Sequence, residues 1–160
     1  MTPDMMMSVT IQPDRPRFVL DASIATKWFL RDEDYVTEAV ALLRRMQFGR
    51  AEYLAPSQIQ FEVANALCNA VRRARMDQNL AQRALSRWVA LRIPVVTSDH
   101  LMRDAMRLSL AFGCAFYDGL YLALAEATDL PLIHADERLH NTLAGRFPNE
   151  LWIADVAKSL

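Results

Sequence analysis

The stretch 18-FVLDASIATKWFL-30 decides the fold class, because its pattern changes at Asp21. Residues 18–20 form a short apolar run, which is typical of a strand buried on both faces. Ser23 is a favourable N-cap, and residues 24–30 continue with a helical pattern. The stretch therefore predicts a buried strand that ends at Asp21 and leads directly into a helix.

The same alternation of strand and helix continues along the chain. Further strands are predicted at 53–55, 95–96, 132–133 and 151–153, with helices at 35–48, 57–76, 80–91, 100–112, 117–127 and 137–143. Short apolar strands separated by helices favour a parallel sheet that is covered on both faces. We therefore expect a three-layer α/β/α sandwich around a central, mainly parallel, five-stranded sheet.

Length and composition indicate one packed domain. The chain has 160 residues, of which 52% are hydrophobic and 23% are charged, far from the composition of a disordered protein. Residues 1–16 hold three prolines and show no periodicity, so we expect them to be a loose leader. A single domain over residues 17–160 is predicted.

Charge and cysteine content restrict the function only weakly. The net charge of −1 gives no overall attraction for nucleic acid. One basic cluster stands out, with a single acid, Asp77, among its residues: Arg72, Arg73, Arg75, Arg83, Arg87 and Arg92. It is either a pair of solvated helix faces or a phosphate-binding surface. Cys68 and Cys114 lie in apolar stretches and are interpreted as core thiols in a reducing cytoplasm.

Two acids follow predicted strands. In open parallel sheets, ligands bind beyond the carboxyl ends of the strands, where the winding direction reverses. Asp21 comes directly after the first strand, and Asp136 comes three residues after the fourth. If these strands are neighbours, the two carboxylates meet in that crevice, although an Asp between a strand and a helix is also a common N-cap.

A third acid, Glu62, lies on the polar stripe of the helix predicted at 57–76. The stripe also holds Asn65, Asn69 and Arg73, within about 80° on a helical wheel. The opposite side is apolar and consists of Val63, Ala64, Leu67, Cys68 and Val71. Such a stripe is usually a solvated face, but Glu62 lies in the first turns, near the strand ends.

The fourth acid, Asp118, has almost wholly apolar surroundings, 114-CAFYDGLYLALA-125. A helix that is apolar on all sides is normally buried, and a buried carboxylate needs a partner. Asp118 is then either a first-turn residue that interacts with the helix dipole or a ligand of a divalent cation.

Four stretches in this order, 18–30, 58-QIQFEVANAL-67, 116-FYDGLYLALAE-126 and 132-LIHADERL-139, resemble the PIN domain, in particular the VapC-type toxins of bacterial toxin–antitoxin pairs. The resemblance covers about Arg17 to Ile153. It implies that the four acids, Asp21, Glu62, Asp118 and Asp136, bind Mg²⁺ or Mn²⁺ for hydrolysis of RNA phosphodiesters. Carboxylates and waters suit both ions, which activate a water and stabilise a leaving oxygen.

The resemblance has one departure: His134 stands where family members commonly carry Thr or Ser, two residues before the last Asp. His134, Ser23, Asn65 and Arg73 are predicted to support the acids or to contact substrate. The resemblance also implies an RNA substrate, a homodimer and a cognate antitoxin protein. Trp28, Phe29 and Leu30 follow Lys27 without a charge among them, and we expect them to form an exposed partner surface.

Two alternatives remain open from the sequence. A catalytically degraded PIN-like protein-binding module would explain His134 and the neutral charge. A phosphotransfer domain with Asp21 phosphorylated is disfavoured, because such enzymes usually place a second Asp where this chain has Ser23. No dinucleotide-binding or P-loop motif occurs.

Overall fold

A computed structural model describes residues 15–156 of the chain. Within this range it contains five strands and eight helices. In chain order they are β1 (Arg17–Leu20), α1 (Ala22–Lys27), α2 (Val36–Gln47), β2 (Glu52–Pro56), α3 (Gln58–Arg72), α4 (Gln78–Ala90), β3 (Val95–Val96), α5 (Asp99–Phe112), α6 (Phe116–Thr128), β4 (Leu132–His134), α7 (Glu137–Leu143), β5 (Glu150–Trp152) and α8 (Ile153–Val156).

The five strands form one sheet in the order β3-β2-β1-β4-β5, and all neighbouring pairs are parallel. The chain winds outward from β1 to β3 and then crosses back to place β4 on the other side of β1. Leu20, the last residue of β1, pairs with Ile133, so β4 ends one residue beyond the end of β1. The winding direction therefore reverses between β1 and β4, the place where open α/β sheets bind their ligands.

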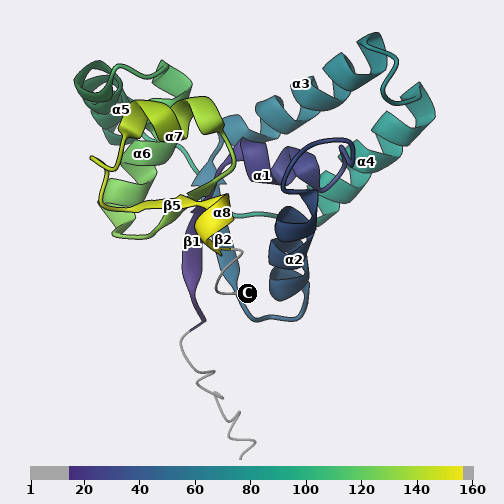
Figure 1. The fold of residues 1–160 in the computed structure, drawn as a ribbon, viewed down its shortest axis with the longest axis horizontal. Coiled ribbons are helices and arrows are strands. Elements are labelled where there is room, and N and C mark those ends of the chain that lie inside the picture. Colours follow the sequence, from purple (N-terminus) through teal and green to yellow (C-terminus); the bar gives the residue numbers. More distant parts are fainter. Residues whose placement is uncertain (1–14, 157–160) are drawn as a thin grey trace, which may run out of the picture.

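Helices cover both faces of the sheet. Figure 1 shows α5, α6 and α7 on one side and α1 and α2 on the other, while α3 and α4 extend together beyond the sheet. The predicted three-layer α/β/α architecture is confirmed, and the sheet is parallel throughout.

Helix α6 lies at the centre of the core, with Leu120 to Ala125 buried on every side. Its first turn packs very closely on α5: a Cβ atom added to Gly119 would lie 2.1 Å from Ser109 Oγ and 2.5 Å from the carbonyl oxygen of Ala105. Only glycine leaves room for this approach. The position of Asp118, the preceding residue, is thereby set by helix packing.

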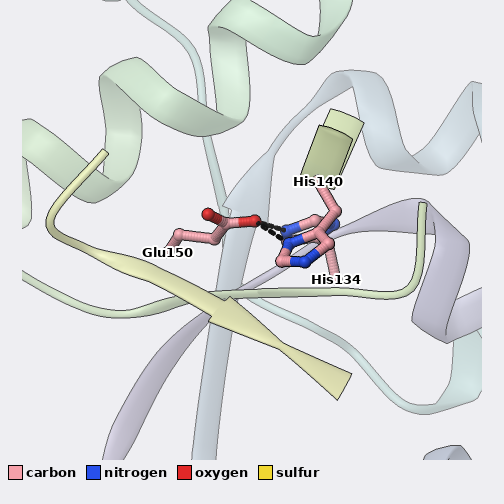
Figure 2. A group of neighbouring side chains, drawn as sticks. All are labelled: His134, His140 and Glu150. Carbon is pink, nitrogen blue, oxygen red and sulfur yellow. Dashed lines mark hydrogen bonds and ion pairs between the residues drawn. The ribbon is translucent and has the colours of Figure 1, made fainter. Parts of the chain in front are cut away.

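A polar cluster holds the β5 edge of the sheet. His134 at the end of β4 lies beside Glu150 of β5 and His140 of α7, and Figure 2 shows the two imidazole rings meeting the carboxylate. Trp152 of β5 packs against both rings. Three elements of the C-terminal half are thus joined at one place.

Two predictions about burial are wrong. Cys68 is exposed rather than a core thiol, because the buried face of α3 runs through Ile59, Val63, Leu67 and Ala70; Cys114 is half-buried. The core face of the helix is therefore rotated relative to the predicted one.

The predicted exposed surface at Trp28 is also wrong. Trp28 is only 3% exposed and Leu30 is buried too, whereas Phe29 is half-buried. The indole Nε1 of Trp28 donates to the carbonyl oxygen of Ala39 at 2.8 Å, and its ring lies 6.1 Å from that of Trp88. These side chains complete the core between α1, α2 and α4.

The ends of the elements differ slightly from prediction. Helix α3 ends at Arg72 rather than at 76, because Ala74 adopts a left-handed conformation with φ of 55°. Asp77 then caps α4 by accepting from the backbone N–H of Leu80. Strand β5 begins one residue earlier than predicted, and α8 follows it unpredicted.

Most of the predicted leader, residues 1–14, lies outside the described range; Pro16 within it accepts a hydrogen bond from the N–H of Glu52. In residues 15–156 no single helix is long and apolar enough to cross a membrane. Only α5 and α6 taken together, across a bend of 111°, meet that test.

Candidate metal centre

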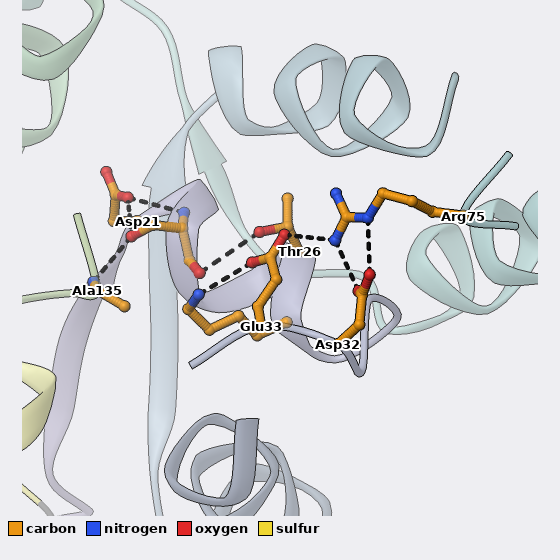
Figure 3. A network of polar contacts seen from close by, with 8 residues as sticks. Asp21, Thr26, Asp32, Glu33, Arg75 and Ala135 are labelled. Atoms are coloured by element: carbon orange, nitrogen blue, oxygen red, sulfur yellow. Dashed lines mark hydrogen bonds and ion pairs between the residues drawn. The ribbon is translucent and has the colours of Figure 1, made fainter. Parts of the chain in front are cut away.

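Asp21 lies where β1 ends and caps the N-terminus of α1. Its Oδ2 accepts from the backbone N–H of Ser23 at 2.8 Å and from the Ser23 hydroxyl. The same hydroxyl accepts from the backbone N–H of Ala135 at 2.9 Å, and Figure 3 shows Ala135 beside Asp21. Ser23 thus holds the carboxylate of Asp21 against the chain that leaves β4.

Glu62 lies in the second turn of α3 and faces α6. The phenol of Tyr121, a buried residue of α6, donates to its Oε2. Burial raises the pKa of Glu62 to about 7; the Tyr121 hydrogen bond opposes this, and the charges of Asp21 and Asp118 add to it. Glu62 is therefore close enough to Asp21 and Asp118 for their negative charges to raise its pKa.

Asp118 lies in the first turn of α6, with its side chain 18% exposed. Its Oδ2 accepts from the backbone N–H of Ala115 at 3.3 Å and from Arg138 at 3.4 Å. Burial raises the pKa of Asp118, and the charges of Asp21 and Asp136 raise it further. The hydrogen bond from Ala115 and the charge of Arg138 lower the pKa of Asp118, but burial and the two carboxylates outweigh them.

Asp136 caps α7 two residues beyond the end of β4. Its Oδ1 accepts from the backbone N–H of Leu139 at 3.1 Å. The negative charge of Asp136 also raises the pKa of Asp21, although burial of Asp21 is the larger cause and the Ser23 hydrogen bonds oppose both. The capping interaction fixes the residue at the β1–β4 crevice.

The structure therefore gathers the four predicted acids at the carboxyl edge of the sheet, from four different elements. Burial and mutual repulsion disfavour the charged forms of Asp21, Glu62 and Asp118, which a bound cation would offset. Among residues 15–156, no three of these carboxylate oxygens lie within 4.8 Å of one another. Mg²⁺ keeps several of its waters and is usually bound through one or two protein carboxylates, so contact of all four acids with one ion is not required.

The other predicted residues divide into two groups. Ser23 contacts Asp21 directly, as described above. His134 is fully buried and contacts Glu150 rather than one of the four acids. Asn65 is exposed one turn beyond Glu62, and Arg73 lies eleven positions after Glu62, roughly 16 Å along the helix axis. The structure does not bring Arg73 to the acids.

Two side chains of the site were missed from the sequence. Tyr121 follows Asp118 by three residues and therefore shares its side of α6, a spacing that could have indicated it. Arg138 follows Asp136 by two residues, and its 74% exposed side chain reaches Asp118 of another helix. Only the packing of α7 beside α6 reveals that contact.

The fold and the acids define an α/β protein with a carboxylate-rich site where the sheet reverses its winding. The model of the PIN domain matches residues 18–143, which include all four acids, and the chain belongs to the PIN domain family. PIN domains are generally nucleases and usually depend on divalent metal.

The same fold is found among solved structures. PAE2754 from Pyrobaculum aerophilum superposes with a TM-score of 0.63 at 22% sequence identity, over 88% of this chain and 92% of that one. A comparison with curated proteins gives no match.

Proposed function

We propose that the protein is a Mg²⁺- or Mn²⁺-dependent endoribonuclease. The observation that carries the proposal is the gathering of Asp21, Glu62, Asp118 and Asp136 at the β1–β4 crevice, with the pKa values of the first three raised. A divalent ion bound there would activate a water and stabilise the leaving oxygen of a phosphodiester.

The chain's own residues supply orientation and charge. Ser23 holds the carboxylate of Asp21, and Tyr121 holds that of Glu62. Arg138 is highly exposed beside Asp118, so its guanidinium is available to a phosphate at the edge of the site. Each proposed ligand therefore has a partner that restricts its rotamer, which supports a site built for an ion.

RNA binding is proposed to extend along α3 and α4. Arg72, Arg73, Arg83, Arg87 and Arg92 are all exposed there. Arg75 is different, because its guanidinium forms ion pairs with Asp32 and Glu33, as Figure 3 shows. We therefore assign phosphate contacts to the other arginines of the cluster.

The degraded-module alternative rested on His134 and on the neutral net charge. The contact of His134 with Glu150, and the bridge that Ser23 makes between Asp21 and Ala135, support the nuclease over this alternative. His134 therefore leaves the contacts of Ser23 with Asp21 and Ala135 in place.

The toxin role, a cognate antitoxin and a homodimer are also proposed. With Trp28 buried, the surface that supports a partner is a groove of about 360 Å³ between α3 and α4, lined by Ala64, Leu67, Cys68, Val71, Ala81 and Leu85. An amphipathic antitoxin segment fits such a groove. Light scattering at micromolar concentration tests the dimer, and a strict monomer would contradict it.

Cleavage of a panel of structured RNAs tests the enzyme. Activity is expected in loops and single strands with Mg²⁺ or Mn²⁺, to be lost with EDTA, and to return when cation is added back. Cleavage that persists in EDTA would overturn the mechanism.

A further inference from the structure

A second group of ligand-type atoms lies outside the four acids. His134 Nε2 is 3.1 Å from Glu150 Oε1, and His140 Nδ1 is 2.7 Å from the same oxygen. All three atoms lie within 4.8 Å of one another. They come from β4, α7 and β5, and in Figure 2 they face one common point.

Both imidazoles meet the same oxygen of the carboxylate, Glu150 Oε1, although Glu150 has a second oxygen. His134 is fully buried, and among residues 15–156 its other ring nitrogen, Nδ1, has no hydrogen-bond partner. The one hydrogen bond of this buried ring is therefore at Nε2, the nitrogen that would bind the ion.

Aromatic packing holds the rings in place. Trp152 stacks on His140 with 4.6 Å between centroids and 12° between planes, and it lies 5.4 Å from His134. Tyr35 packs edge-on against Trp152 at 5.7 Å. Rings locked in this way lose little entropy when an ion binds, and the half-exposed His140 leaves a path for its entry.

We propose that His134, His140 and Glu150 form a second metal site, selective for Zn²⁺ or a similar borderline cation. Two imidazoles and one carboxylate are a known zinc ligand set, which leaves the fourth position to water. Imidazole nitrogens favour such ions over Mg²⁺. Zinc bonds of 2.0–2.1 Å place tetrahedral ligand atoms about 3.3 Å apart, so the 3.1 Å and 2.7 Å separations from Glu150 Oε1 would have to lengthen by about 0.2 Å and about 0.6 Å.

The site has a structural consequence that does not depend on nuclease activity. An ion held there joins β4, α7 and β5, and His134 lies two residues before Asp136. Zinc would therefore stabilise the edge of the sheet that carries one of the four acids. Its binding energy adds directly to the free energy of unfolding, because the unfolded chain does not hold the three ligands together.

Cobalt titration tests the site in the full-length protein, with excess Mg²⁺ present to occupy the acids. We expect one equivalent of Co²⁺ with the visible absorption of a tetrahedral ion, no thiolate charge-transfer band, and displacement by Zn²⁺. Because Trp152 lies on the ligand rings, Co²⁺ should also quench fluorescence that Trp152→Phe removes.

His140→Ala should weaken Co²⁺ and Zn²⁺ binding at least tenfold, whereas His100→Ala, at an exposed position of α5, should leave it unchanged. Circular dichroism establishes that both variants are folded, and Glu150→Gln gives a second test of the ligand set. Absence of binding at micromolar Co²⁺, or equal binding by His140→Ala and the wild type, would overturn the proposal.

Discussion

The carboxylate of Asp21 and the backbone N–H of Ala135 are joined through a single atom, the hydroxyl oxygen of Ser23. This oxygen donates its proton to Asp21 and accepts from Ala135, so the exits of β1 and β4 are tied together (Figure 3). The link exists because the two strands are neighbours and pair in register. It couples the geometry of the proposed metal centre to the sheet itself.

Ser23→Ala should therefore impair the site without unfolding the protein. Loss of a residue that orients a metal ligand typically costs 10–100-fold in metal affinity or activity. We expect a loss of this size in RNA cleavage, partly restored by higher Mg²⁺. Wild-type cleavage at limiting Mg²⁺ would show that the bridge has no role in positioning Asp21.

Removing a proposed ligand should be far more damaging. Asp21→Asn and Asp118→Asn should each lower the rate of RNA cleavage by several orders of magnitude, since each removes transition-state stabilisation supplied through the ion. Asp104→Asn, on the exposed surface of α5, is the matched control and should cleave normally. If both active-site variants remain close to wild type, the ligand assignment is wrong.

The acids should make the metal-free protein less stable as pH rises. Glu62 has an unfolded pKa near 4.5 and a folded pKa of about 7, so the folded state binds more protons between these values. Stability is then present below pH 4.5 and lost as pH rises toward 7, and the raised pKa values of Asp21 and Asp118 act in the same direction. Urea unfolding at pH 5 and pH 8 measures the loss.

Two controls accompany that experiment. Glu62→Gln should reduce the pH dependence, because its amide does not titrate. Saturating Mg²⁺ should stabilise the protein more at pH 8 than at pH 5, because the ion competes with protons for the carboxylates. Stability that rises from pH 5 to pH 8 without metal would contradict the burial of these groups.

Gly119→Ala should destabilise the protein by about 1–3 kcal/mol, a typical cost of overpacking a tight helix contact. The added methyl group meets Ser109 Oγ and the carbonyl oxygen of Ala105. Ser109→Gly in the same chain should recover only part of the loss, because the carbonyl contact remains. Thermal unfolding of the three proteins measures both effects, and an unchanged midpoint in Gly119→Ala would refute the close approach of α5 and α6.

The arginines of α3 and α4 should differ in their effect on RNA affinity. Arg73→Glu should weaken binding and reduce the salt dependence by about 0.7 in log–log slope for each phosphate of single-stranded RNA that the protein no longer neutralises. Arg75→Glu should instead lower stability, because it opposes Asp32 and Glu33. Fluorescence anisotropy across a salt series measures the RNA affinity of both variants. Identical salt slopes for Arg73→Glu and the wild type would show that Arg73 does not contact a phosphate.

The sequence by itself determined the elements and the edge of the sheet at which chemistry is expected. Apolar runs of strand length and helical spacing are local patterns, so they placed Asp21 at the end of β1 and Asp136 shortly after β4. The alternation of strand and helix then predicted a parallel sheet, in which Asp21 and Asp136 would meet if the first and fourth strands were neighbours, and the β1–β4 pairing shows that they are.

Only the tertiary structure decided which side chains are buried and which residues of different elements contact one another. The orientation of α3 about its axis exposes Cys68, and the packing of α1 buries Trp28. Both depend on which neighbouring elements each helix packs against. The contact of Tyr121 with Glu62 and the convergence of His140 with Glu150 join residues 59 and 10 positions apart. Local periodicity holds no information about such contacts, since they depend on which strands and helices pack side by side.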